Sequence, residues 1–109
     1  MKNRKGLRRR RDCNHILYRL DCTVTGEFYI GLSAVIRGRA IKRTLTERFR
    51  RHYSKAIHES RTWTLHKRLR RYGPQKWQKQ VLAVVRGRDV AFSEERRLIR
   101  KLAPSLNTF

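Results

Sequence analysis

Two short apolar stretches separated by a turn define the start of the folded part of this chain of 109 residues. In residues 16–22, Ile16, Tyr18, Leu20 and Cys22 alternate with Leu17, Arg19 and Asp21, which is the period of a β-strand. Gly26 suits a tight turn. In the stretch that follows, Phe28 and Ile30 share one face and Tyr29 lies on the other. The pattern predicts a β-hairpin.

Two helices are predicted in the middle of the chain. The first spans residues 44–57, where four apolar side chains recur at helical spacing and would face the core. They are Leu45, Phe49, Tyr53 and Ala56. The second spans residues 62–72 and is ended by Gly73 and Pro74.

The last part of the chain predicts one more strand and one more helix. Residues 81–85, VLAVV, form a short apolar run that is typical of a buried strand. Ser93 is expected to cap the final helix, with Glu94 and Glu95 in its first turn, where acids favour the helix dipole. Its buried side is expected to consist of Leu98, Ile99 and Leu102.

The order of these elements is β-β-α-α-β-α, which predicts a small α+β fold: one mixed sheet of three strands flanked by helices. We expect a single domain over residues 13–109. Residues 1–12 hold seven basic side chains and one acid, so they predict a flexible basic arm. Residues 34–46 are expected to be a basic insertion that leads into the first helix.

Lysine and arginine number 29 against 8 aspartate and glutamate residues, a net charge of +21. Self-repulsion of this size opposes compaction, and a polyanionic partner would relieve it. Nucleic acid is the expected partner, with an acidic membrane surface second. The chain has no run of about 18 apolar residues, so no membrane span is predicted.

Cys13 and Cys22 are expected to stay reduced, which predicts the cytoplasm, or the host cytoplasm for a phage-encoded chain.

The basic residues expected to contact phosphates are clustered. Such contacts position a protein on DNA without reading its sequence. The predicted contacts are Arg8, Arg9, Arg10 and Arg11 in the arm, Arg37, Arg39, Lys42 and Arg43 in the 34–46 segment, and Arg51 on the first helix.

Several short motifs follow one another in a recognisable order from about residue 15 to residue 107. Together they resemble the GIY-YIG nuclease family. The motifs are Ile16-Leu17-Tyr18, Tyr29-Ile30-Gly31, Arg48 with His52, Leu69 to Gly73 followed by Trp77, Glu95, and Pro104 to Asn107.

The resemblance implies a metal-dependent, homing-endonuclease-like DNA endonuclease. Glu95 would bind Mg²⁺ or Mn²⁺, and a lone carboxylate completed by water and phosphate is adequate for magnesium. Arg48 would stabilise the charged phosphorane, and His52 would orient water or a tyrosine. Tyr18 and Tyr29 would form the catalytic face, where one phenol helps to deprotonate the attacking water if nearby cations lower its pKa. Asn107 would contribute to DNA binding.

Three alternatives remain open from the sequence. The interval from Gly31 to Arg48 is longer than usual in the family, so Arg39 is the other candidate for the catalytic arginine. Strand tyrosines are commonly core residues, which is the competing interpretation of Tyr18 and Tyr29. The runner-up function is a non-catalytic, basic nucleic-acid-binding protein, RNA- or ribosome-associated, which has no need for an inward acid such as Glu95. For an endonuclease, specificity could come from a homodimer partner or an accessory specificity protein.

Overall fold

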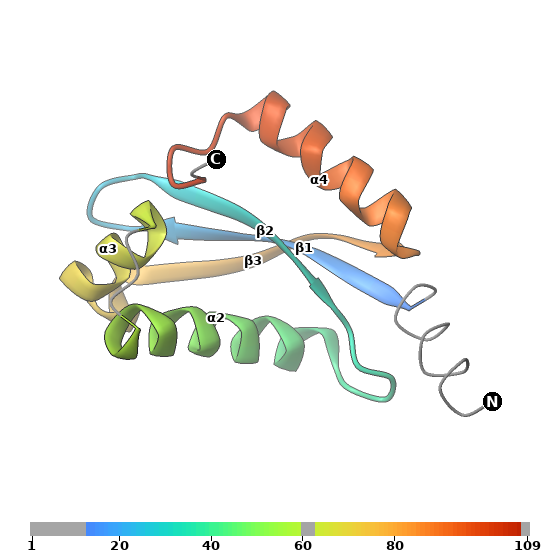
Figure 1. The fold of residues 1–109 in the computed structure, drawn as a ribbon, viewed down its shortest axis with the longest axis horizontal. Coiled ribbons are helices and arrows are strands. Elements are labelled where there is room, and N and C mark those ends of the chain that lie inside the picture. Colours follow the sequence, from blue (N-terminus) through green and yellow to red (C-terminus); the bar gives the residue numbers. More distant parts are fainter. Residues whose placement is uncertain (1–12, 60–62, 108–109) are drawn as a thin grey trace.

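The computed structural model describes residues 13–59 and 63–107 (Figure 1). The predicted arm, residues 1–12, lies outside the described residues. Three strands form the sheet: β1 (Asn14–Cys22), β2 (Phe28–Ala34) and β3 (Trp77–Arg86), in the spatial order β2-β1-β3. The predicted hairpin is therefore confirmed as β1 and β2.

The sheet is antiparallel throughout, where we predicted a mixed one. β1 lies between the other two strands and runs antiparallel to both. The two helices that follow β2 carry the chain across to the far edge of the sheet. β3 consequently runs in the direction of β2, but its hydrogen-bonded neighbour is β1.

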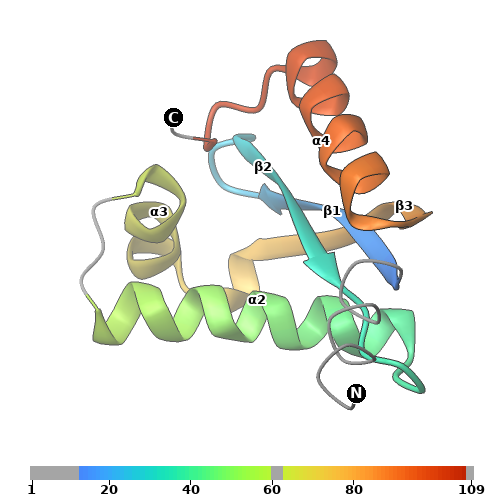
Figure 2. The same cartoon turned by 45° about the vertical axis from the view of Figure 1, so that its right-hand side comes forward.

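Helices cover both faces of the sheet. α2 (Ile41–His58) and α3 (Thr64–Tyr72) lie on one face, and α4 (Arg88–Leu102) lies on the other (Figures 1 and 2). A 3₁₀ turn (Pro74–Lys76) leads from α3 into β3. The element order is the predicted β-β-α-α-β-α. Within the described residues, no helix is both long enough and apolar enough to cross a membrane.

The alternation in β1 distributes its side chains between two packed layers. One set packs against the apolar faces of α2 and α3 to form the main buried cluster. That set consists of Ile16, Tyr18, Leu20 and Cys22, all nearly or fully buried. On the other face, Leu17 and Ile30 are fully buried, as is Ala91 of α4. Burial of one such aliphatic side chain stabilises a fold by about 1.5–3 kcal/mol.

The first helix begins earlier than predicted. α2 starts at Ile41, so residues 41–46 of the expected basic loop are helical, and residues 35–40 connect β2 to it. Thr44 supports this start, because its backbone N–H donates to Ala40 O at 3.0 Å and its hydroxyl donates to the same oxygen at 3.2 Å.

The start of α4 corrects the prediction of a Ser93 cap. Gly87 has a φ of 92°, a left-handed conformation that glycine adopts at little cost. It turns the chain directly from β3 into the helix, and the Ala91 N–H donates to Gly87 O at 3.0 Å. Asp89 is therefore the acid of the first turn. Ser93, Glu94 and Glu95 lie further along the helix.

Burial in the last two elements is looser than predicted. β3 is an edge strand of ten residues, and Val84 of the expected buried run is 49% exposed. On α4, Leu98 and Ile99 are half-buried and Leu102 is exposed. The C-terminal segment packs back onto the sheet, because Leu106 is buried and its N–H donates to Phe28 O at 3.1 Å.

Candidate active site

Tyr18 and Tyr29 lie side by side on the sheet face that α2 covers. Their ring centroids are 6.2 Å apart. Gly31 is the register partner of Tyr18 on β2. A Cβ atom at Gly31 would lie 2.4 Å from both Cζ and Oη of Tyr18, so only glycine lets the phenol cross the neighbouring strand. The two tyrosine motifs of the sequence are thus coupled by direct packing.

Arg48 and His52 approach Tyr18 from α2. They are four residues apart, so they share a face of the helix. Nε of Arg48 donates to Tyr18 Oη at 3.3 Å, and Tyr18 Oη lies 2.8 Å from Nε2 of His52. Three of the five residues predicted to be catalytic therefore meet in one hydrogen-bonded cluster.

Arg39 lies elsewhere. Its Nη1 donates to Oε2 of Glu47 at 2.7 Å, and Arg43 shares the same carboxylate through a 3.0 Å bond to Oε1. The fold thus brings Arg48, and not Arg39, to the tyrosines. The catalytic role of Arg48 stays a prediction. Arg39, the other candidate, is instead paired with Glu47 of α2.

His66 continues the hydrogen-bond chain beyond His52. Nδ1 of His52 lies 3.2 Å from Nε2 of His66, which is fully buried in α3. One proton arrangement is consistent with all three contacts: Arg48 donates to Tyr18, Tyr18 to His52, and His52 to His66. Trp63 stacks on His66 with ring centroids 5.0 Å apart and an interplanar angle of 25°.

His66 is not among the residues predicted for the site, although the sequence contains a signal for it. His66 and Leu69 are three residues apart on a short helix, so they share its buried face. A histidine on a buried helical face needs a polar partner. What the sequence could not supply was the identity of that partner, which lies 14 residues earlier on α2.

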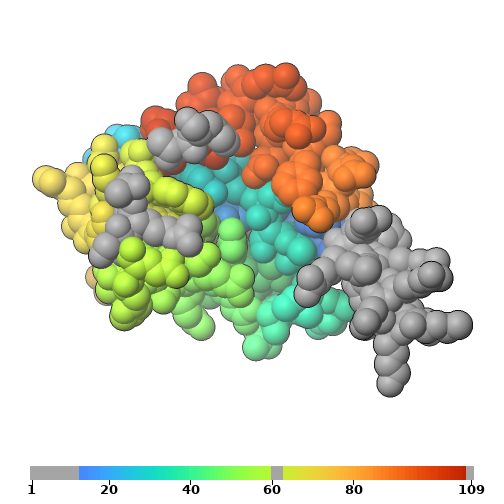
Figure 3. Space-filling model, in the orientation of Figure 1, coloured from blue at the N-terminus to red at the C-terminus, as the bar shows by residue number. Residues whose placement is uncertain are grey.

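Glu95 and Tyr29 line a hollow of about 190 Å³. It is formed where α4, α3, β2 and the C-terminal segment meet. Figure 3 shows parts of α4, α3 and β2 at the surface on the same side of the molecule. The residues that line the hollow are Tyr29, Trp63, Leu65, Glu95, Ile99, Leu106 and Asn107. Two of the predicted catalytic residues and the predicted Asn107 therefore border one cavity.

The Glu95 carboxylate forms no hydrogen bond or ion pair with any residue of the described ranges. It differs in this from Glu27, Glu47 and Glu94, each of which is paired with an arginine. Partial burial raises the pKa of Glu95, and the charge of Arg96 opposes this shift. An unpaired, half-buried carboxylate beside a cavity suits a cation as its missing partner.

The surroundings of Glu95 fit a magnesium ion better than a transition metal. Among the residues that the structure describes, no group of three or more His, Cys, Asp or Glu side chains gathers at one place. Magnesium keeps several waters and takes one or two carboxylates together with substrate phosphate. A single carboxylate at the wall of an open cavity matches that donor set.

Burial keeps Tyr18, Tyr29 and His52 uncharged at neutral pH. It raises the pKa of Tyr18 and of Tyr29 above the usual value near 10, and Arg48 only partly offsets the shift. From the sequence, the role of a phenol as base is conditional on cations that lower its pKa; among the described residues Arg48 does so, and burial outweighs it. Burial, followed by the charges of Arg48 and His66, lowers the pKa of His52 to about 3.

Asn107 joins the end of the chain to β2. Its Nδ2 donates to Ile30 O at 2.8 Å, and its Oδ1 accepts from Ile30 N–H at 2.9 Å. The side-chain amide is thereby fixed at the wall of the hollow. Its contact with DNA stays a prediction.

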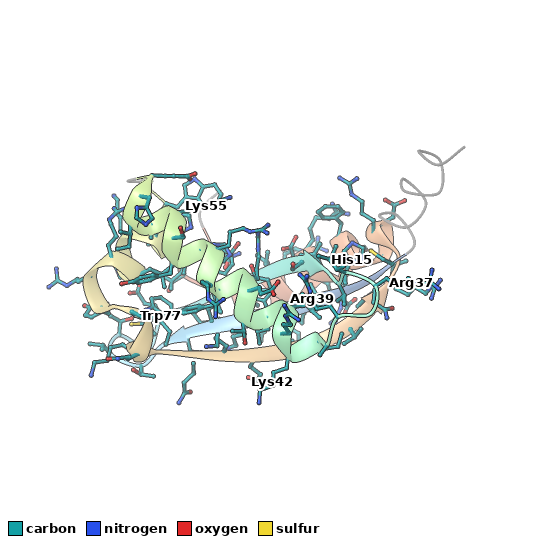
Figure 4. All side chains as sticks on the ribbon, turned by 90° about the horizontal axis from the view of Figure 1, so that it is seen from below. His15, Arg37, Arg39, Lys42, Lys55 and Trp77 are labelled. Atoms are coloured by element: carbon teal, nitrogen blue, oxygen red, sulfur yellow. The ribbon has the colours of Figure 1, made fainter. Side chains whose placement is uncertain are left out.

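The predicted phosphate contacts lie mainly along α2 and the loop before it. Arg37, Lys42 and Arg51 are exposed, and Figure 4 shows Arg37 and Lys42 at the start of α2, away from Lys55 near its other end. Arg39 and Arg43 share Glu47, which reduces their net positive charge. Arg8 to Arg11 lie outside the described residues.

The sheet presents two adjacent tyrosines to a helix that carries Arg48 and His52, which is the arrangement that the resemblance to GIY-YIG nucleases implied. Among solved structures, the chain is similar to the catalytic domain of homing endonuclease I-TevI, with a TM-score of 0.62 and 14% identity over 82% of this chain and 88% of that one. A mutant of the catalytic domain of intron endonuclease I-TevI matches with a TM-score of 0.66 and 14% identity, over 88% and 91%. The resemblance to the family is thus confirmed at the level of the fold. No protein-family model and no curated protein matches the sequence.

Proposed function

We propose that this chain is a metal-dependent endonuclease, similar to homing endonucleases, that hydrolyses phosphodiester bonds in DNA. One observation carries the proposal. The carboxylate of Glu95, which pairs with no residue of the described ranges, lines a hollow together with Tyr29, next to the cluster of Arg48, Tyr18 and His52. This arrangement occurs in a chain of net charge +21 whose fold is that of an endonuclease catalytic domain.

Glu95 would hold the Mg²⁺ or Mn²⁺ ion. When bound, a divalent cation supplies positive charge to the phosphate and to the oxygens that attack and leave. The hollow has room for water and phosphate around the carboxylate. Partial burial raises the pKa of the Glu95 carboxyl, and a bound cation would also stabilise its charged form.

Arg48 is placed to bind the phosphate. Among its contacts with the described residues, it uses Nε towards Tyr18, which fixes the plane of the guanidinium. Its terminal nitrogens then remain for the substrate. A positioned donor of this kind stabilises charge that develops in the transition state, and such donors are typically worth about 10²–10³ in rate.

Tyr29 is the phenol that can touch the substrate, because it lines the hollow while Tyr18 is fully buried. We assign Tyr18 and His52 to holding Arg48 and Tyr29 in place. With its raised pKa, Tyr29 keeps its proton at neutral pH and orients the attacking water. It can take a proton from that water only as a phenolate, a form that becomes more populated as the pH rises.

The test is cleavage of supercoiled plasmid with magnesium or with chelator. We expect nicked or linear product from the natural chain with magnesium, and uncut plasmid from Glu95→Gln. Glu94→Gln is the matched control, because Glu94 is the adjacent acid and is paired with Arg97. Equal cleavage by Glu95→Gln would remove Glu95 as the metal ligand.

The second candidate is a non-catalytic, basic nucleic-acid-binding protein, RNA- or ribosome-associated, which the net charge of +21 favours on its own. Glu95→Gln separates the two functions. In a pure binder, removing an acid from a positive surface tightens binding to RNA or DNA, and no cleavage is seen with any metal or nucleic acid. An endonuclease loses cleavage through the same substitution.

A further inference from the structure

The exposed side of α4 carries a row of arginines beside the hollow. Residues four apart on a helix share a face, so a helix of this length presents several parallel rows of side chains. The row that borders the hollow contains Glu95 and Ile99, which line it, and the buried Ala91. The next row lies about 100° further round the helix. It is exposed along its whole length and consists of Arg88, Phe92, Arg96 and Arg100.

This second row contains no acid. Its three arginines, which we call the α4 arginine row, form no ion pair with an acid of the described ranges. The row that follows it round the helix begins with Asp89, and its Arg97 is paired with Glu94. The positive charge that α4 can offer to a partner therefore lies mainly beside the hollow.

Contacts along the helix fix where this charge acts. The charge of Arg96 reaches the Glu95 carboxyl, because it opposes the rise in pKa that burial causes there. The guanidinium of Arg88 lies over the Phe92 ring, with Cζ 5.3 Å from the ring centroid. With a rise of 1.5 Å per residue, the row spans about 18 Å from its first arginine to its last.

The chemistry and the length of the row restrict its partner. Arginine stays charged at any physiological pH, and its planar fork matches the geometry of phosphate. One strand of duplex DNA carries a phosphate about every 3.4 Å along the helix axis, so about 18 Å is long enough for each arginine to contact a different phosphate. The hollow in which the proposed function places the cleaved phosphate borders the same side of α4.

We propose that the α4 arginine row binds the DNA backbone next to the cleaved phosphate, on the side of the proposed metal ligand. The inference rests on the proposed function and adds the course of the substrate. The phosphate contacts predicted on α2 and in the segment before it belong to the other face of the sheet, and β2 runs between α2 and α4 (Figure 2). The DNA therefore crosses the β2 edge and is held by helices from both faces. Contacts of this kind position the strand without reading its sequence.

The salt dependence of binding counts the phosphate contacts. Each lost contact lowers the slope of log K against log salt by about 0.9, which weakens binding roughly 8-fold at about 0.1 M salt. The full chain is titrated with a short duplex DNA in the presence of chelator, so that neither cleavage nor a metal on Glu95 contributes. The double variant Arg96→Ala, Arg100→Ala should lower the slope by about 1.8 and weaken binding roughly 60-fold at about 0.1 M salt.

The matched control is the double variant Arg97→Ala, Lys101→Ala. It removes the same number of cations from the same helix, but from the row that lies further from the hollow. Loss of Arg97 also leaves Glu94 unpaired, so this control overstates the effect of charge alone. Its salt slope should nevertheless stay close to that of the natural chain. An equal fall in both double variants, no fall in the first, or a fall on duplex RNA but not on DNA would overturn the proposal.

Single-turnover cleavage distinguishes this inference from the function on which it rests. At a pH where Glu95 is ionised, Arg96→Ala, Arg100→Ala should need more protein for half-maximal rate but should keep the maximal rate, since backbone contacts hold substrate and transition state alike. A lower maximal rate with unchanged binding would overturn the role as a backbone contact. Cleavage by the natural chain without any difference in salt slope would overturn the row and leave the nuclease intact. A difference in slope in a chain that never cuts would support the row and count against the nuclease.

Discussion

The two faces of the sheet are packed in different ways. On the α2–α3 face, a chain of polar groups runs from the half-buried Arg48 into the hydrophobic cluster, and each neighbouring pair lies within hydrogen-bond distance. The chain consists of Arg48, Tyr18, His52 and His66. On the α4 face, Leu17, Ile30 and Ala91 are buried, whereas Leu98 and Ile99 are only half-buried and Leu102 is exposed.

The difference indicates that the two faces contribute different residues to the site. The tightly packed face fixes the arginine and the phenols, because each polar group holds the next in place. The loosely packed helix contributes Glu95, whose carboxylate forms no ion pair within the described residues. A closely packed α4 would have filled the hollow that Glu95 needs. Substitutions on each face should separate these two contributions.

Glu95→Gln should lower metal-dependent cleavage by about 10³-fold or more, since loss of a metal ligand removes several kcal/mol of charge stabilisation. The same change should raise the melting temperature. Burial raises the pKa of Glu95 in the folded chain, so its charged form opposes folding at neutral pH. Thermal melts and plasmid cleavage measure the two effects. A lower melting temperature would show that Glu95 is a stabilising residue of α4.

Arg48→Ala should reduce the cleavage rate by about 10²–10³-fold, the usual cost of a lost charge-stabilising donor. Arg39→Ala is the control, because Arg39 is paired with Glu47 away from the tyrosines. Its effect should be confined to weaker binding at high salt. Single-turnover rates at saturating protein separate the two variants. A larger loss with Arg39→Ala would place the catalytic arginine at the start of α2.

Tyr29→Phe should reduce the rate by about 10²-fold, within the range for a positioned proton-transfer group. In the natural chain the rate should rise with pH above neutrality, because the pKa of Tyr29 is raised and its phenolate is scarce at neutral pH. It should also fall towards acid pH as Glu95 becomes protonated. Cleavage rates measured over a range of pH test both the rise and the fall. An unchanged rate in Tyr29→Phe would make Tyr29 a packing residue.

The buried histidine chain should make the fold acid-sensitive. The pKa of His52 is about 3 in the folded chain, compared with 6.5 as its ordinary value. Below pH 6.5 the unfolded chain binds a proton that the folded chain excludes, so the stability present above that pH is lost as the pH falls. The loss is about 1.4 kcal/mol for each pH unit down to the folded pKa.

Urea unfolding between pH 7 and pH 4 measures this dependence. His52→Gln is the matched variant, because an amide keeps a polar contact with Tyr18 but does not titrate. It should flatten the dependence over that range. The same slope in both proteins would show that other groups cause the acid sensitivity.

The sequence by itself determined the local structure and much of the fold. The alternation in residues 16–22 and the helical spacing of Leu45, Phe49 and Ala56 dictate which faces are buried. The order of the motifs indicated the family fold before any coordinates, because each motif belongs to a particular strand or helix. The prediction that Ser93 caps the last helix was wrong because Gly87 provides a stronger local signal. Its left-handed backbone starts α4 directly.

Tertiary structure alone decided which of these faces meet. Spacing showed that Arg48 and His52 share a helical face, but only the packing of α2 on β1 brings that face, and not Arg39, to Tyr18. Only the approach of α3 gives His52 its partner His66. The physical reason is that periodicity fixes the direction of a side chain relative to its own element, whereas its partner is set by how separate elements pack.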